Sequence, residues 1–161
     1  MEEAYRNGKV RAIGVSNFYP DRFLDICHFS EIKPAVNQME THVFHQQVTS
    51  RKYMKKHGTQ LMSWGPFAEG KNDYFNNPVL NSIGKKYGKS AAQTALRFLL
   101  QNDVVLIPKT THKNRMEENF DIFDFQLNSE EMKEIEALDT GKSLFFSHYD
   151  PDIVEWFMTM A

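Results

Sequence analysis

The sequence predicts an α/β fold with parallel strands, on three observations. Short apolar runs typical of strands alternate with amphipathic runs typical of helices along the 161 residues. Glycine, proline and asparagine separate these runs, so that each element is short. Polar side chains gather where the expected strands end, which is the edge at which parallel sheets bind ligands.

Four runs are expected as strands: 11–16 (RAIGVS), 34–40 (PAVNQME), 60–64 (QLMSW) and 104–107 (VVLI). Pro34 opens the second run, at the strand position where a missing N–H costs least. Gly65 and Pro66 end the third run, and Pro108 ends the fourth.

Four amphipathic runs are expected as helices: 21–29, 46–56, 90–101 and 128–138. Ser90 and Gln93 predict a capping box at the start of the third, ahead of an apolar stripe. Asn128 is the expected cap of the fourth, and Gly58 ends the second. A further helix is expected to start near Lys113, whereas residues 65–78, rich in Gly, Asn and Pro, are expected to form a long loop.

Composition excludes several classes of protein. Lys and Arg number 19 against 21 Asp and Glu, which argues against broad binding to nucleic acid or an acidic membrane. Cys27 is the only cysteine, so no intrachain disulfide can form. No apolar run approaches the roughly 18 residues that span a bilayer, and the first residues lack the apolar stretch of a signal peptide. We therefore expect a cytoplasmic protein with a reduced thiol.

Two parallel folds fit this pattern, an open doubly wound sheet and a piece of a (β/α) barrel. In an open sheet the ligand site gathers at one switch point. Here polar residues follow all four expected strands: Ser16-Asn17, Gln38 and Glu40, Trp64, and Lys109-Thr110. A ring of strands requires that arrangement, so the barrel is favoured.

The segment after the fourth strand is strongly basic. Residues 109–115 hold three positive charges and no acid, between a strand end and a helix start. Lys109, the Arg115 guanidinium and the free N–H groups of the helix start together predict an anion site. The alternative is a solvated basic loop, since charge runs usually lie on the surface.

Three other positions have both a functional and a structural interpretation. Ser16-Asn17 could bind a carboxamide or cap the following helix. Gln38 lies in an otherwise apolar strand, where a buried amide needs partners. Trp64 could be a stacking platform or an ordinary core residue.

Other chemistries find little support. Gly88-Lys89-Ser90 resembles the end of a P-loop, but the required first glycine is Ile83. His42 and His45 lack a third ligand with fitting spacing, so no metal site is expected. Nucleophilic catalysis has no motif, and the adjacent pairs Glu117-Glu118 and Glu130-Glu131 are interpreted as helix-surface charge.

Four segments in sequence order resemble the aldo-keto reductase family: GKVRAIGVSNF (8–18), PAVNQMETHVFHQQ (34–47), SWGPFAEGK (63–71) and the run from Lys89 to Met132. The tail SLFFSHYDPDIVEWF is similar to that of bacterial diketogluconate reductases. The resemblance implies the C-terminal half of a (β/α)8 TIM barrel over residues 1–139, with a tail over 140–161. It also implies NADP(H) as the cofactor and a small carbonyl substrate.

The resemblance assigns roles residue by residue. Ser16, Asn17 and Gln38 match the contacts of the nicotinamide carboxamide, and Trp64 matches the residue that stacks on the ring. The remaining matches are Gly65, Pro66 and Phe67 along the pyrophosphate, Lys109, Thr110 and Arg115 around the adenosine 2′-phosphate, and Glu118 and Asn119 beside the adenine. His112 lies in the same loop, where the family usually has another residue.

The chain departs from the family in its chemistry. The catalytic Asp, Tyr, Lys and His of the family lie on the first half of the barrel, and none of the six tyrosines here stands in that context. A TIM barrel needs about 250 residues, so the chain is short by roughly 90. We therefore expect no catalytic residue and no activity of the chain alone.

A half-barrel has two open edges and an uncovered inner face, which we expect to be apolar. The expectation is a homo-oligomer in which half-barrels close one another. Two alternatives remain, a non-catalytic oligomerising or nucleotide-binding module, and an incomplete gene model of a full-length reductase.

Overall fold

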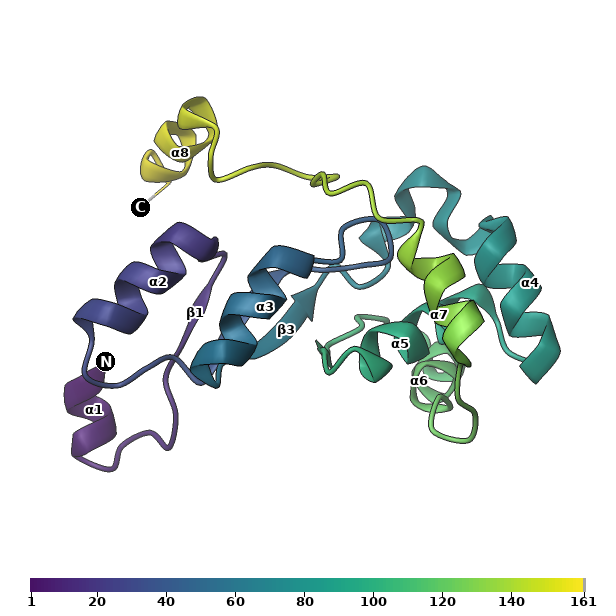
Figure 1. Cartoon of the computed structure of the whole chain (residues 1–161), viewed down its shortest axis with the longest axis horizontal. Helices are drawn as coiled ribbons and strands as arrows, with labels where there is room; N and C mark the ends of the chain where they lie inside the picture. Colours follow the sequence, from purple (N-terminus) through teal and green to yellow (C-terminus); the bar gives the residue numbers. More distant parts are fainter. Residues whose placement is uncertain (161) are drawn as a thin grey trace.

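The computed structural model describes residues 1–160. Its centre is one parallel sheet of four strands in the order β1-β2-β3-β4 (Figure 1). The strands are β1 (Gly14–Ser16), β2 (Val36–Glu40), β3 (Gln60–Trp64) and β4 (Val105–Leu106). Consecutive strands are neighbours throughout, as in a barrel rather than in a doubly wound sheet, where the order reverses.

Eight α-helices and one 3-10 helix are present among the described residues: α1 (Glu2–Arg6), α2 (Pro20–Phe29), α3 (Val48–His57), η1 (Ala68–Asn76), α4 (Pro78–Tyr87), α5 (Ala91–Gln101), α6 (Lys113–Phe120), α7 (Ser129–Glu136) and α8 (Pro151–Met158). Helices connect the parallel strands, as crossovers must. None of the helices within residues 1–160 is long and apolar enough to cross a membrane.

The caps expected from sequence are present. The Ser90 hydroxyl accepts the Gln93 N–H while the Gln93 side chain accepts the Ser90 N–H, which makes a capping box at α5. Asn128 and Glu131 form a second box at α7. Gly58 ends α3 with φ +72°, a conformation that glycine adopts without strain.

The prediction of a loop over 65–78 is wrong in part. Short turns over residues 68–76 make up η1, but residues 69–73 within it have non-helical backbone angles and keep the expected loop character, whereas α4 begins at Pro78. The Asn77 side chain accepts the N–H groups of Val79 and Leu80, so Asn and Pro act here as a helix start rather than as loop residues. Leu80 then packs in the core.

Burial alternates along the strands and separates the two faces of the sheet. Asn37, Met39, Leu61 and Ser63 are buried beneath the helices. Their neighbours on the other face stay partly exposed, and the strand register places them side by side: Ser16, Val36, Gln38, Gln60, Met62 and Trp64. One face of the sheet is therefore covered and the other is open. The open face is mixed in polarity, which corrects the expectation of an apolar inner face.

The tail crosses the carboxyl edge of this sheet. After α7 the chain runs over the sheet and ends in α8, on the side of α2 (yellow-green in Figure 1). Tyr149, two residues before α8 begins, donates to the Asp21 carboxylate of α2 at 3.2 Å. The first and last parts of the chain are thus joined above the sheet.

Candidate functional site

A hollow of about 300 Å³ lies where α5, α6 and the loop after β4 meet. Six of the residues expected to bind cofactor line it: Phe67, Lys109, Thr110, Arg115, Glu118 and Asn119. Sequence reasoning did not select the other lining residues: Phe75, Asn81, Ser90, Ala91 and Ala92. Of these, only Ser90 carried a signal, as a helix cap.

The basic loop after β4 carries cationic side chains and leads into the start of α6. Helix α6 begins at Lys113 without a side-chain cap, so its first N–H groups have no partner from the cap residue, His112. The Thr110 hydroxyl accepts the His112 N–H at 3.1 Å and shapes the turn. Among residues 1–160, neither Lys109 nor Arg115 forms an ion pair. Two cations without an ion-pair partner therefore line the same hollow, and one of them, Arg115, lies in the first turn of α6.

Glu118, one turn after Arg115 on α6, is held in place by residues at the start of α5. The Ser90 hydroxyl donates to the Glu118 carboxylate at 2.5 Å, and the Gln93 amide donates to the Glu118 carbonyl at 3.2 Å. Ser90 thus caps α5 and positions Glu118 at once. Of the pair expected as helix-surface charge, Glu117 is exposed, whereas Glu118 is half-buried and hydrogen-bonded to Ser90.

A second group of expected residues lies at the carboxyl ends of β1, β2 and β3. The Trp64 indole N–H donates to the Asn17 side-chain oxygen at 2.7 Å. The Ser16 hydroxyl donates to the Gln38 carbonyl at 3.1 Å, and the Gln38 amide lies 3.3 Å from the Met62 sulfur. Tyr19 is the N-cap of α2, so the helix-cap interpretation of Ser16-Asn17 is wrong.

Gly65 to Phe67 join the two groups. Gly65 takes a positive φ of +61°, which turns the chain away from β3. The buried Tyr74 hydroxyl donates to the Pro66 carbonyl at 2.8 Å, and Phe67 reaches the hollow. The twelve expected residues therefore lie along one edge of the sheet, from the end of β1 to the first turns of α6.

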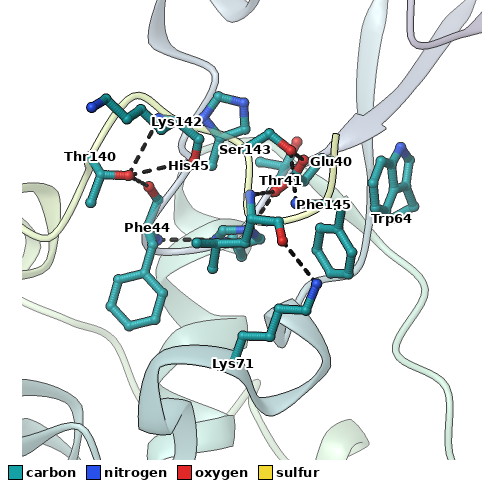
Figure 2. Close-up of polar contacts among 12 residues, drawn as sticks. Glu40, Thr41, Phe44, His45, Trp64, Lys71, Thr140, Lys142, Ser143 and Phe145 are labelled. Atoms are coloured by element: carbon teal, nitrogen blue, oxygen red, sulfur yellow. Dashed lines mark hydrogen bonds and ion pairs between the residues drawn. The ribbon is translucent and has the colours of Figure 1, made fainter. Parts of the chain in front are cut away.

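The tail covers part of this edge (Figure 2). Phe146 stacks on Trp64 with ring centroids 5.7 Å apart and an interplanar angle of 21°, and Phe145 meets Trp64 edge-on at 5.2 Å. The last residue of β2, Glu40, is only 4% exposed. The family resemblance implied that the tail around Phe145, Phe146 and Trp156 helps to choose the substrate, but it did not predict that Phe145 and Phe146 pack on Trp64.

Burial alone would raise the pKa of Glu40. Hydrogen bonds from His42, Ser143 and the Leu144 N–H outweigh that effect and hold the pKa below its ordinary value. His45 has a lowered pKa, chiefly because burial disfavours its charged form. No group of three potential metal ligands comes together within the described part of the chain.

Parallel neighbouring strands with outer helices, and a hollow lined by Lys109 and Arg115 near the carboxyl ends of the strands, are consistent with part of a (β/α)8 barrel. The family model for aldo/keto reductases matches residues 1–140. The chain belongs to the aldo/keto reductase family.

Curated relatives and solved structures agree on this family. The chain is 46% identical over 138 residues to glyoxal reductase of Bacillus subtilis, covering 86% of this chain and 49% of the relative. It is 41% identical over 145 residues to the 9,11-endoperoxide prostaglandin H2 reductase of Trypanosoma cruzi, covering 89% and 51%. The chain spans about half the length of the curated relatives it matches.

The solved structures that resemble this chain are also matched over about half of their length. The aldo-keto reductase MGS-M4, from a deep-sea metagenome library, superimposes with a TM-score of 0.89 at 39% identity, over 92% of this chain and 55% of that one. A variant of Gox0644 in complex with NADPH superimposes with a TM-score of 0.85 at 32% identity, over 91% and 53%. The four-stranded fold thus corresponds to about half of a known barrel.

Proposed function

We propose that this chain is the cofactor-binding half of an NADP(H)-dependent carbonyl oxidoreductase. The observation that carries the proposal is the convergence of Lys109, Thr110 and Arg115 on one hollow, at the sheet edge that also holds Trp64. A solved relative in complex with NADPH and relatives named as reductases of carbonyl compounds support it.

Different residues of the hollow would bind different parts of the cofactor. Lys109 and Arg115 would hold the 2′-phosphate, because both cations are free and the α6 N-terminus adds donors. Asn119 and the Glu118 carboxylate, fixed by Ser90, would contact the adenine. Bound NADPH would supply a hydride.

At the other end of the edge, Trp64 would stack on the nicotinamide ring. The Asn17 side-chain oxygen already accepts the indole N–H, so its amide NH₂ remains to orient a carboxamide. Gln38 lies beside it on the open face of the sheet.

We further propose that the proton donor for carbonyl reduction comes from outside this chain. Three of its tyrosines are engaged elsewhere: Tyr74 donates to the Pro66 carbonyl, Tyr87 to the Glu131 carboxylate and Tyr149 to Asp21. The pKa of Tyr74 is raised by burial, which opposes ionisation. The isolated chain would then bind cofactor without reducing a small carbonyl substrate.

Cofactor selectivity tests the binding half of the proposal. Arg115→Ala removes a charge-assisted hydrogen bond of about 1.5–3 kcal/mol, which corresponds to about 10- to 150-fold weaker NADPH binding. NADH lacks the 2′-phosphate and should lose less than about threefold. Lys113→Ala is the matched control, because it removes a charge from the same segment without lining the hollow. Calorimetric titration measures both cofactors, and equal losses for the two would contradict the assignment.

We also propose that a second copy of the chain covers the open face. The chain exposes 10030 Å², whereas a compact monomer of this mass exposes about 8,300 Å². That difference of roughly 1,700 Å² is about twice what a standard interface buries on one partner, and it falls within the roughly 1,000–2,500 Å² per subunit that large obligate homodimers bury. Beside the unpaired edge of β4, an apolar groove is lined in part by Met116, Phe120 and Phe123, which are 52%, 76% and 62% exposed.

Light scattering after size exclusion tests the dimer. The wild-type chain should have twice the 18.8 kDa mass of one copy. Phe120→Glu should convert the dimer to a monomer. Val48→Glu changes an exposed apolar residue on α3, away from the edge strands β1 and β4, and should leave the dimer intact. A wild-type monomer would overturn the proposal. A stable dimer that binds neither NADPH nor NADH would favour a purely assembling, non-catalytic module.

A further inference from the structure

A buried carboxylate fastens the tail to the sheet. Glu40 ends β2 on the open face of the sheet and receives three hydrogen bonds. One oxygen accepts His42 Nε2 at 3.0 Å and the Leu144 N–H at 2.9 Å, and the other accepts the Ser143 hydroxyl at 2.5 Å. Burying a charge is costly unless it is fully paired, so each of these donors matters.

The tail is shaped around that anchor. The Ser143 hydroxyl oxygen accepts the N–H groups of Phe145 and Phe146 at 3.0 and 2.9 Å, which turns the chain immediately after the anchor. Lys71 strengthens the turn from η1: its ammonium donates to the Leu144 carbonyl at 2.8 Å and lies 3.8 Å from the centre of the Phe145 ring (Figure 2).

This turn delivers two aromatic rings to Trp64. Phe146 covers one face of the indole, and Phe145 meets it edge-on. Asn17 holds the indole N–H from the end of β1. The indole is therefore restrained on three sides by groups that come from two distant parts of the chain.

We propose that Glu40 is a positioning residue for Trp64: it fastens residues 143–146 so that Phe145 and Phe146 back the indole, whose other face receives a planar ring. The part of this inference that concerns a ligand rests on the proposed cofactor site. A platform that is already ordered loses less side-chain entropy when a ring stacks on it, so the fastened tail strengthens binding.

Ligand-free measurements test the fastening directly. In a Trp156→Phe background, Trp64 is the only tryptophan and reports on its own surroundings. Glu40→Gln and Ser143→Ala each remove a bond between tail and sheet. Both should increase hydrogen exchange of the 143–146 amides by about tenfold or more and raise acrylamide quenching of Trp64.

The matched control is Glu131→Gln. Glu131 is also a buried carboxylate with three donors, from Lys86, Tyr87 and Asn128, but it lies on α7 and does not touch the tail. It should lower global stability without changing exchange at 143–146 or quenching of Trp64. Unchanged exchange and quenching in Glu40→Gln would overturn the inference, whatever the chain binds.

NADPH titration then tests the consequence for the ligand. Glu40→Gln and Phe146→Ala should weaken binding about 3- to 10-fold, whereas Glu131→Gln should leave it unchanged. Tighter NADPH binding by Glu40→Gln or by Phe146→Ala would show that the tail blocks the Trp64 indole, and the proposed role of the tail in supporting the indole would then be wrong. If the wild-type chain binds no NADPH, the proposed function fails, while the ligand-free measurements still decide whether Glu40 fastens the tail.

Discussion

Gly84→Ala tests the packing beneath the candidate site, because two effects of opposite sign compete there. Gly84 lies inside α4 with ordinary helical geometry, where alanine normally stabilises a helix by about 1 kcal/mol. A Cβ at this position, however, would lie 2.5 Å from the Lys89 carbonyl oxygen and 2.7 Å from the Thr94 hydroxyl oxygen. Neither neighbour moves easily, because Lys89 N–H donates to the Gly84 carbonyl and Thr94 donates to Ser90.

The clash should outweigh the gain in helix propensity. Both neighbours are closer than an unstrained contact, so α4 and α5 must separate, and overpacking of this kind costs about 1–3 kcal/mol or more. We expect Gly84→Ala to lower the free energy of unfolding by about 1–3 kcal/mol, seen as a lower urea midpoint with an unchanged slope. Lys85→Ala, one residue further on the exposed face, is the control and should be neutral. A Gly84→Ala protein as stable as the wild type would refute this account of the α4–α5 contact.

Three further outcomes follow from buried groups and are checked by standard solution measurements. Tyr74→Phe leaves the Pro66 carbonyl without its donor in the core, so urea unfolding should show a loss of about 1–2 kcal/mol. Burial alone would raise the pKa of Glu131, but the hydrogen bonds to its carboxylate outweigh burial and hold the pKa below the ordinary value of 4.5. The carboxylate should therefore contribute fully to stability above pH 4.5, and this contribution should disappear as the pH falls through the lowered pKa. Glu131→Gln should then flatten the acid side of the profile of unfolding free energy against pH. Burial also raises the pKa of Cys27, so a thiol reagent should modify it slowly in the native chain and fully in denaturant.

The parts of the fold that the sequence predicted are those determined locally. The third strand has the predicted bounds, 60–64, because an apolar run meets a glycine and a proline at its end. Helix α5 follows from the Ser90–Gln93 capping box. Helix α4 was missed because Asn77 and Pro78 signal both a turn and a helix start, and the distinction depends on whether the following apolar residues find a core.

The residues of the site likewise fall into those that a local sequence pattern predicts and those that only the fold brings together. Residues 109–115 are contiguous, so their shared charge predicted an anion site that the fold places on one hollow. The bond between Glu40 and Ser143 joins residues 103 positions apart, and no local pattern indicates it. Glu131 was wrongly expected on the surface: adjacent helical residues point about 100° apart, so one of the Glu130-Glu131 pair can turn inward, and Glu131 is 1% exposed.

The two faces of the sheet separate stability from binding. The covered face packs against a continuous core that includes Met39 and Leu61, where helices and strands stabilise one another. The open face carries the amide of Gln38 beside the largely apolar side chains of Met62 and Trp64. This mixture suits neither a fully apolar core nor a surface in contact with water alone. Substitutions on the covered face should therefore change the free energy of unfolding, whereas those on the open face should change what the sheet binds.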